Sequence, residues 1–268
     1  MKSLQPATFK AVVNLFHQIS GIRLADSKQA LVYSRLQKLA LEAGVTDVEE
    51  YAQRVIDGKV SQADLVAVVD RLTTNETYFF REPQHFEDLR RRVLALPHGH
   101  DLRIWSSAAS SGEEAYSIAM LLADVRGLDQ AWAIWGTDLS TAMVQAAQQG
   151  LYPLERARNV SPDYLRRFCR KGQGAYEGQL LMARELRERT QFLAANLMEK
   201  LPAELPQFDV IFLRNVLTYF DPPAKAAVVR RVLEKLKPDG VLYTGHAEPL
   251  TGLELPLRAL APAVYLHA

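Results

Sequence analysis

The stretch LRIWSSAASSGEEAYSIAM, residues 102 to 120, decides the fold that we expect of this chain. Residues 102 to 105 form a short apolar run, the next seven residues are small, and Tyr116, Ala119 and Met120 then recur at helical spacing. This order predicts a strand, a tight loop and a helix, the first half of an α/β crossover. Ligands of such folds bind outside the carboxyl end of the strand, beside the N-terminus of the helix.

The loop between this strand and helix holds one glycine and two acidic residues, Gly112, Glu113 and Glu114. A dinucleotide site usually has the pattern GxGxxG here, with backbone N–H groups facing a pyrophosphate. Carboxylates would repel a pyrophosphate but would attract a ligand with an ammonium or sulfonium group. The alternative is that Glu113 and Glu114 only complement the positive end of the helix dipole.

Composition describes an ordinary globular protein. The 268 residues are 48% hydrophobic, which suffices for one large or two modest domains. Lysine and arginine number 32 against 31 aspartate and glutamate, so no overall field favours nucleic acid or an anionic membrane as partner. Cys169 is the only cysteine, which excludes an internal disulfide and fits a reducing cytoplasm. No apolar run approaches the ~20 residues of a membrane span, and the start of the chain lacks the apolar segment of a signal peptide.

Residues 1 to 72 are predicted to be all-helical, because apolar residues recur there at spacings of three and four. Thr46 with Glu49, and Ser61 with Asp64, resemble capping boxes at the starts of two of the helices. We therefore expect a small helical domain at the N-terminus.

Lys28, Arg35 and Lys38 share one polar face of the second predicted helix, which could contact an acidic partner helix. The alternative is a solvated surface face, because Glu42 interrupts the positive charge.

Residues 73 to 82, TTNETYFFRE, do not read as a plain linker. Three small polar residues precede the aromatic run Tyr78 to Phe80 and Arg81, and Pro83 suits the first turn of a helix that runs to about Ala95. One interpretation is that the aromatic residues fill the joint between two domains while Arg81 faces a cleft.

The remaining chain alternates between strand and helix patterns. We expect strands at 131–137, 191–195, 208–213, 241–244 and 263–267, the last of them antiparallel and at an edge, and helices at 139–149 and from Asp221 to about Leu236. Residues 150 to 190 break the alternation and predict a small antiparallel sheet. An edge strand of such a sheet can bind an extended peptide, or the sheet can be decoration without a partner.

Asp138 ends the second predicted strand, where an acidic residue accepts hydrogen bonds from ribose hydroxyls in nucleotide-binding folds. Adenosine is therefore a reasonable ligand. The alternative is that Asp138 caps the following helix, although Ser140 could cap it equally well.

Several motifs together resemble the bacterial chemotaxis receptor methyltransferases (CheR), in the expected order and over essentially the whole chain. They are TNETYFFRE at 74–82, SSAASSGEEAYSIAM at 106–120, Asp138, NL at 196–197, FDVIFLRNVLTYFD at 208–221 and LKPDGVLYTGHAE at 236–248. The resemblance implies a protein-glutamate O-methyltransferase that uses S-adenosylmethionine and releases S-adenosylhomocysteine. It also implies an α/β fold with a doubly wound, mostly parallel sheet, an all-helical N-terminal domain and an inserted antiparallel β-subdomain.

In domain terms, the resemblance implies a helical domain over residues 1–72 and a segment over 73–82 that contributes to the active site. A methyltransferase domain follows over 83–268, with the β-subdomain inserted at about 150–190. Arg35 and Lys38 form a thinner positive set than the arginine-rich second helix of many family members.

The family pattern also implies roles for individual residues. Arg81 and Tyr219 correspond to the reaction centre, although Tyr219 could be an ordinary packing residue at a helix start. The cofactor-binding residues are then Asn75, Thr77 and Arg81 in the aromatic segment, Glu114 for the methionyl ammonium region, Asp138 for the ribose, Asn196 and Leu197 for the adenine, and Asn215 and Val216 for the rest of the methionyl and ribose moiety. No metal ligands are expected, and His246 is the only histidine expected near the site, in a structural role.

The expected substrate is a glutamate on a chemoreceptor's cytoplasmic helix, modified in chemotaxis adaptation by a monomeric enzyme. A glutamate with a pKa near 4.3 is ionised at neutral pH, so the reaction needs no general base. The resemblance further implies that the β-subdomain could bind the receptor's C-terminal peptide. The alternatives are a methyltransferase-fold signalling module without catalysis and a protein acceptor other than a chemoreceptor.

Overall fold

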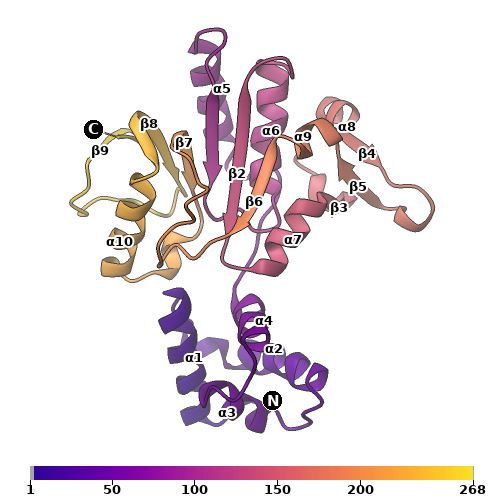
Figure 1. The fold of residues 1–268 in the computed structure, drawn as a ribbon, viewed down its shortest axis with the longest axis vertical. Coiled ribbons are helices and arrows are strands. Elements are labelled where there is room, and N and C mark those ends of the chain that lie inside the picture. The colour runs from indigo at the N-terminus through magenta and orange to yellow at the C-terminus, as the bar shows by residue number, and fades with distance from the viewer. Residues whose placement is uncertain (1–2, 268) are drawn as a thin grey trace. The chain divides into compact units, whose positions relative to one another are not determined.

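The computed structural model describes residues 3–267, and the chain divides into two compact units. The first contains the residues up to Thr74 together with Tyr219–Lys225, and the second contains Asn75–Thr218 and the chain from Ala226 onward. Figure 1 shows the helices of the first unit in indigo and the sheet of the second unit in colours from magenta to yellow.

The first unit is helical, as predicted. Its four α-helices are α1 (Pro6–Ser20), α2 (Gln29–Glu42), α3 (Val48–Ile56) and α4 (Gln62–Leu72). Each turns its apolar positions inward, because residues three and four apart share one face of a helix. The buried side chains include Phe9, Phe16, Val32, Leu36 and Tyr51.

The helix starts confirm one of the two predicted capping boxes. Ser61 and Asp64 cap α4 reciprocally, each side chain accepting from the other's backbone N–H. The prediction for Thr46 is wrong, since Asp47 caps α3 by accepting from the backbone N–H of Glu49. The Glu49 carboxylate accepts instead from the Thr8 hydroxyl of α1.

Arg35, the central residue of the predicted positive face of α2, bonds to the backbone of another helix of the same unit. The Arg35 guanidinium donates to the carbonyl oxygens of Leu72 and Thr73, at 2.9 and 3.1 Å, and so stabilises the C-terminal end of α4. Lys38 stays exposed on α2, and Lys28, which is also exposed, is the N-cap residue before α2 rather than a member of the helix as predicted.

The second unit is built on a seven-stranded sheet of order β6-β2-β1-β7-β8-β10-β9. The first five of these strands are parallel, and β10 and β9 are antiparallel. In chain order the strands are β1 (Leu102–Ser106), β2 (Trp132–Asp138), β6 (Thr190–Ala194), β7 (Phe208–Leu213), β8 (Leu236–Thr244), β9 (Leu257–Ala261) and β10 (Val264–His267). The chain leaves β1 toward β2 on one side and later adds β7 on the other, so the strand order reverses beside β1. This confirms the predicted doubly wound, mostly parallel sheet.

The longer helices of this unit are α5 (Pro83–Ala95), α6 (Glu113–Val125), α7 (Thr141–Gln149) and the part of α10 (Pro222–Leu233) from Ala226 onward. Helix α6 packs on β1, β2 and β6, and α7 packs on β2 and β6. Helix α6 starts directly at the end of the loop that follows β1, as the opening stretch of sequence predicts.

The C-terminal strands differ from the prediction. β8 begins at Leu236 rather than at residue 241, and β10 is covered by β9, which forms the edge. The residues of β9, LRALA, are mostly exposed and do not alternate between apolar and polar faces, so periodicity could not identify this strand.

The predicted inserted sheet is present between α7 and β6. Its strand order is β3-β5-β4, all antiparallel, with β3 at Leu151–Pro153, β4 at Cys169–Lys171 and β5 at Gln179–Met182. Two short helices flank it, α8 (Pro162–Phe168) and α9 (Arg184–Arg187).

Two residues of the aromatic run after α4, Phe79 and Phe80, pack in or against the core of the second unit, whereas Tyr78 is exposed. The Phe79 ring is 1% exposed and packs edge-on against Tyr152 of β3, with 5.1 Å between centroids. Phe80 packs in the same way on Phe86 of α5. Both rings thus pack on residues of the second unit.

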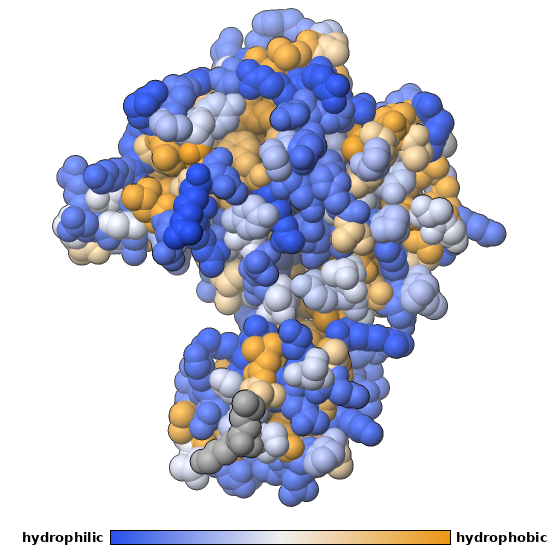
Figure 2. All heavy atoms as spheres, turned by 180° about the vertical axis from the view of Figure 1, so that it is seen from behind, coloured by the Kyte–Doolittle hydropathy of each residue, from blue (hydrophilic) through white to orange (hydrophobic). Residues whose placement is uncertain are grey.

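The surface carries isolated large apolar residues. Figure 2 shows mostly hydrophilic residues, in blue, with smaller apolar areas between them. The most exposed large apolar side chains, Leu41, Leu94 and Tyr176, come from different elements. Within residues 3–267 no helix is both long and apolar enough to span a bilayer.

Candidate active site

The carboxyl ends of β1, β2, β6 and β7 meet at one edge of the sheet, because these strands are parallel. The strand order reverses between β1 and β7, and ligands of doubly wound folds bind in the crevice at such a reversal. The loop after β1 and the residues just beyond β2 and β7 are therefore the candidate site.

Asp138 fixes the loop that follows β1. Its carboxylate accepts from the backbone N–H of Ser110 at 2.7 Å and from that of Ser140 at 2.9 Å. Ser110 in turn donates its hydroxyl to the carbonyl of Asn75, at 3.2 Å. The N-cap of α7 is Ser140, whose Oγ accepts from the N–H of Met143, so the capping alternative for Asp138 is wrong.

Arg214 lies directly after β7, and its side chain is completely buried. Its Nη1 donates to Oε2 of Glu114 at 2.8 Å, and its Nη2 donates to Oε2 of Glu82 at 3.1 Å and to the carbonyl of Arg81. Two carboxylates therefore share one guanidinium, and the group carries a net negative charge when both are ionised. Such a group suits a cationic ligand.

The two carboxylates differ in acidity because they differ in surroundings. Burial raises the pKa of Glu114 by more than the Arg214 guanidinium and the Ser106 hydroxyl lower it. Burial also raises the pKa of Glu82, but the opposite effects of Arg214 and of the Asn215 amide are together larger. The net pKa of Glu82 therefore lies below the usual value. Glu114 is thus the carboxylate held closer to its neutral form.

Glu248 ties the loop after β7 to the loop after β8. Its buried carboxylate accepts from the backbone N–H groups of Asn215 at 2.6 Å, Gly245 at 2.9 Å and Thr218 at 3.0 Å. A Cβ on Gly245 would come within 2.6 Å of a carboxylate oxygen of Glu248, so glycine is required for this close approach.

Backbone strain is concentrated in the same region. Glu82, Ser110 and Asn215 have φ values of +57°, +49° and +58°, in the left-handed region that non-glycine residues avoid. Strained residues of this kind are found preferentially at binding sites, where the surrounding structure holds them in place.

Glu113, the neighbour of Glu114, points into a different environment. Its buried carboxylate pairs with Arg156 of the inserted subdomain at 2.6 Å and accepts from the hydroxyl of Ser111 at 2.7 Å. Of the two acidic residues that begin α6, only Glu114 thus belongs to the Arg214 group, and Glu113 links the loop to the subdomain.

Two family models cover almost the whole chain. The CheR methyltransferase, SAM binding domain matches residues 75–263, and the CheR methyltransferase, all-alpha domain matches residues 7–73. The chain belongs to the CheR methyltransferase family. It is therefore an S-adenosylmethionine-dependent methyltransferase, as the sequence motifs predict.

Named relatives agree with the CheR assignment. The chemotaxis protein methyltransferase of Salmonella typhimurium is 37% identical over 268 residues, which are 98% of this chain and 91% of the relative. Chemotaxis protein methyltransferases 1 and 2 of Pseudomonas aeruginosa are 38% and 37% identical. They cover 92% and 97% of this chain, and the matches span 92% of each relative.

The charges of the residues in this site complement those of the cofactor of CheR enzymes. S-adenosylmethionine carries a sulfonium and an ammonium group, and the site offers Glu82, Glu114 and Asp138 against one buried guanidinium. The backbone of Gly245 also lies close to the side chain of Asn215, which belongs to the same group of residues.

The predicted site residues fall into several groups. Asn75 and Asp138 are joined through Ser110, and Glu114, Asn215 and the backbone of Arg81 are joined through Arg214 and Glu82. The side chain of Arg81 donates to the carbonyl of Glu76 and lies over the ring of Tyr78.

Asn196 follows β6 and bonds within its own turn, to Met198 and Glu199, while Leu197 is buried. Thr77 and Val216 are half-buried, and Tyr219 belongs to the segment that groups with the helical unit.

Three members of this site are not among the residues that the sequence predicts, namely Glu82, Arg214 and Glu248. A signal existed for Arg214, because a charged residue directly after a strand that is buried on both faces must find a partner. The signal for Glu248 was its place at the end of the family motif at residues 236–248, because its partners are backbone groups up to 33 positions away.

Proposed function

We propose that this enzyme transfers a methyl group from S-adenosylmethionine to glutamate side chains on the cytoplasmic helices of a chemoreceptor. The products would be glutamyl methyl esters, formed during chemotaxis adaptation. Similar proteins named chemotaxis protein methyltransferases support the biological setting. The observation that carries the chemistry is the shared buried Arg214, which leaves an excess of carboxylate charge to face a cationic donor.

For the cofactor, we propose that Glu114 faces the ammonium group and that Asp138 accepts from the ribose hydroxyls. The full proposed set follows the family pattern: Asn75, Thr77 and Arg81 from the aromatic segment, Glu114, Asp138, Asn196 and Leu197 at the adenine, and Asn215 and Val216 along the methionyl and ribose moiety. When bound, the cofactor supplies an electrophilic methyl group on a positively charged sulfur.

For the reaction, we propose that the protein contributes placement rather than proton transfer. The acceptor carboxylate is already ionised at neutral pH, and positioning alone can supply roughly 7–11 kcal/mol of a barrier. In this account Arg81 orients the acceptor carboxylate through paired hydrogen bonds, and the Tyr219 hydroxyl holds the attacking oxygen in line.

The raised pKa of Glu114 predicts a pH-dependent affinity for the cofactor. Glu114 attracts an ammonium group only when ionised, so affinity for S-adenosylmethionine should fall as the pH is lowered from 7 toward the usual glutamate value of 4.5. Calorimetry across this range measures the effect. In Glu114→Gln the affinity should be lower at pH 7 and nearly independent of pH, and an equally steep profile in both proteins would contradict the role of Glu114.

For the receptor contact, we propose that an edge strand of the inserted sheet binds the receptor's C-terminal peptide by strand addition. β3 and β4 are the edge strands, and β4 leads into the glycine-containing loop of residues 172–178. Titration of the full chain with receptor tail peptides tests this, and no binding at high peptide concentration would place the enzyme among those that act without a tether. We further expect the enzyme to act as a monomer in the cytoplasm.

The test of the function is incubation with methyl-labelled S-adenosylmethionine and receptor cytoplasmic fragments. Label that is incorporated and then released by alkali identifies methyl esters, because methylamines survive alkali. Fragments in which the acceptor glutamates are replaced by alanine are the control. Label on another signalling protein would favour a different acceptor, and cofactor binding without transfer to any protein would favour a signalling module.

A further inference from the structure

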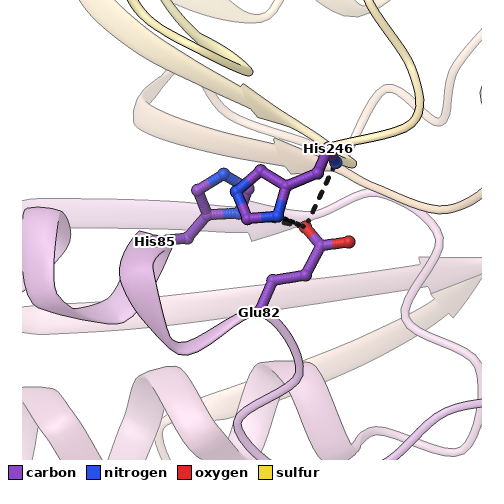
Figure 3. A group of neighbouring side chains, drawn as sticks. All are labelled: Glu82, His85 and His246. Atoms are coloured by element: carbon purple, nitrogen blue, oxygen red, sulfur yellow. Dashed lines mark hydrogen bonds and ion pairs between the residues drawn. The ribbon is translucent and has the colours of Figure 1, made fainter.

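Glu82, His85 and His246 form a compact cluster beside the Arg214 group (Figure 3). Glu82 immediately precedes α5, His85 lies in the first turn of that helix, and His246 follows the end of β8. One potential ligand atom from each residue lies within 4.8 Å of the others. Figure 3 shows the two imidazole rings beside the carboxylate of Glu82.

The two distances from the Glu82 carboxylate to the histidine rings are close to those between ligands of one small metal ion. Oε2 of Glu82 lies 3.4 Å from Nδ1 of His85 and 3.7 Å from Nδ1 of His246. Bonds of about 2.0–2.1 Å to a tetrahedral zinc ion place its ligand atoms roughly 3.4 Å apart. Glu82 and His85 are also three positions apart at a helix start, the Glu-x-x-His spacing found in carboxylate and histidine metal sites.

His85 supplies an independent indication of a ligand. Its side chain is 2% exposed, and neither ring nitrogen has a hydrogen-bond partner. A neutral imidazole ring has one nitrogen with a lone pair that can accept a hydrogen bond or bind a metal ion. Buried ring nitrogens rarely lack a partner, and a metal ion would occupy that lone pair.

The surroundings of Glu82 can support a bound cation. Asn215 donates its amide to the other carboxylate oxygen, Oε1, at 3.2 Å, which orients the carboxylate as outer-shell partners of metal ligands do. Arg214 retains Glu114 as a second partner, so its charge stays balanced if Glu82 turns toward a metal. The His246 side chain is 44% exposed and gives an ion a path from solvent.

We propose that Glu82, His85 and His246 bind one divalent transition-metal ion, with Zn²⁺ as the reference ion. Two imidazoles and one carboxylate suit zinc, cobalt or nickel, whereas magnesium and calcium prefer oxygen ligands. Three protein ligands leave one coordination position open to water or to another ligand. The sequence patterns predict no metal ligands, and this site is independent of the identity of the methyl acceptor.

The test is titration of the tag-free full chain with Zn²⁺, and with Co²⁺ followed by its visible absorption. We expect one ion per chain and an intense absorption band from tetrahedral Co²⁺. His246→Ala should weaken the affinity at least tenfold, and His85→Gln should do the same. His98→Ala is the matched control, because His98 is exposed and lies outside the cluster, and it should change nothing.

Two results would overturn the proposal: no Zn²⁺ binding to the wild-type chain at millimolar metal, or equal binding by wild type and His246→Ala. If His85→Gln fails to fold, His246→Ala still decides, since His246 is a half-exposed residue. Metal binding is measured without methyl transfer, so the result does not depend on the proposed function.

Discussion

Replacing Arg214 by methionine is expected to lower the free energy of unfolding by about 3–5 kcal/mol. The guanidinium is completely buried, and the carboxylates that it joins, Glu82 and Glu114, are only 17% and 14% exposed. Removal of the cation leaves two buried negative charges near each other with no compensating charge. Urea unfolding followed by circular dichroism measures the loss.

The matched control for this variant is Arg103→Met. Arg103 pairs with Asp101 at 2.7 Å, but both side chains are about half exposed, and such pairs contribute at most about 1 kcal/mol. In Arg214→Met/Glu82→Gln/Glu114→Gln the unpaired charges are also removed, so part of the lost stability should return. Equal losses in Arg214→Met and Arg103→Met would show that the buried group does not depend on its cation.

Arg81→Ala and Tyr219→Phe are each expected to lower kcat for methyl transfer by about 10²-fold, because both residues are proposed to align the acceptor carboxylate. Tyr219→Phe should leave the affinity for S-adenosylhomocysteine nearly unchanged, whereas Arg81→Ala should also lower it, since Arg81 belongs to the proposed cofactor-binding set. Steady-state transfer of labelled methyl to a receptor fragment, with calorimetry on the product, separates the two effects.

The controls for these variants are Arg184→Ala and Tyr176→Phe, which alter exposed residues of the inserted subdomain. With a receptor fragment that lacks the C-terminal tail, both should retain wild-type turnover. If Arg81→Ala and Tyr219→Phe also keep full turnover, the proposed reaction centre is misplaced.

The architecture could be predicted because its determinants are local. The strand, loop and helix at residues 102–120 occur where their own apolar spacing places them, and the apolar run of β7 indicates a strand buried on both faces. The strand β9 and the full length of β8 were missed, because β9 is mostly exposed and β8 starts with a polar sequence that reads as a turn.

The site could be predicted only in part, because its decisive contacts are long-range. Asp138 was identified by its place at a strand end, and the acidic start of α6 by its unusual charge. The local charge pattern could not separate Glu113 from Glu114, since the partners that distinguish them, Arg156 and Arg214, lie 43 and 100 residues away. Only the family pattern singled out Glu114. Glu82 and His85 lie three positions apart at the start of α5. His246 lies far away in the sequence and comes close to them only because β8 takes its place in the sheet.

Calorimetry with S-adenosylmethionine and S-adenosylhomocysteine tests the central claim most directly, namely that the carboxylates beyond β1 and β2 hold the methyl donor. The wild-type chain should bind both compounds, and Asp138→Asn should bind them at least about tenfold more weakly, a loss of about 1.4 kcal/mol or more. Absence of heat with either compound, or unchanged affinity in Asp138→Asn, would contradict the account.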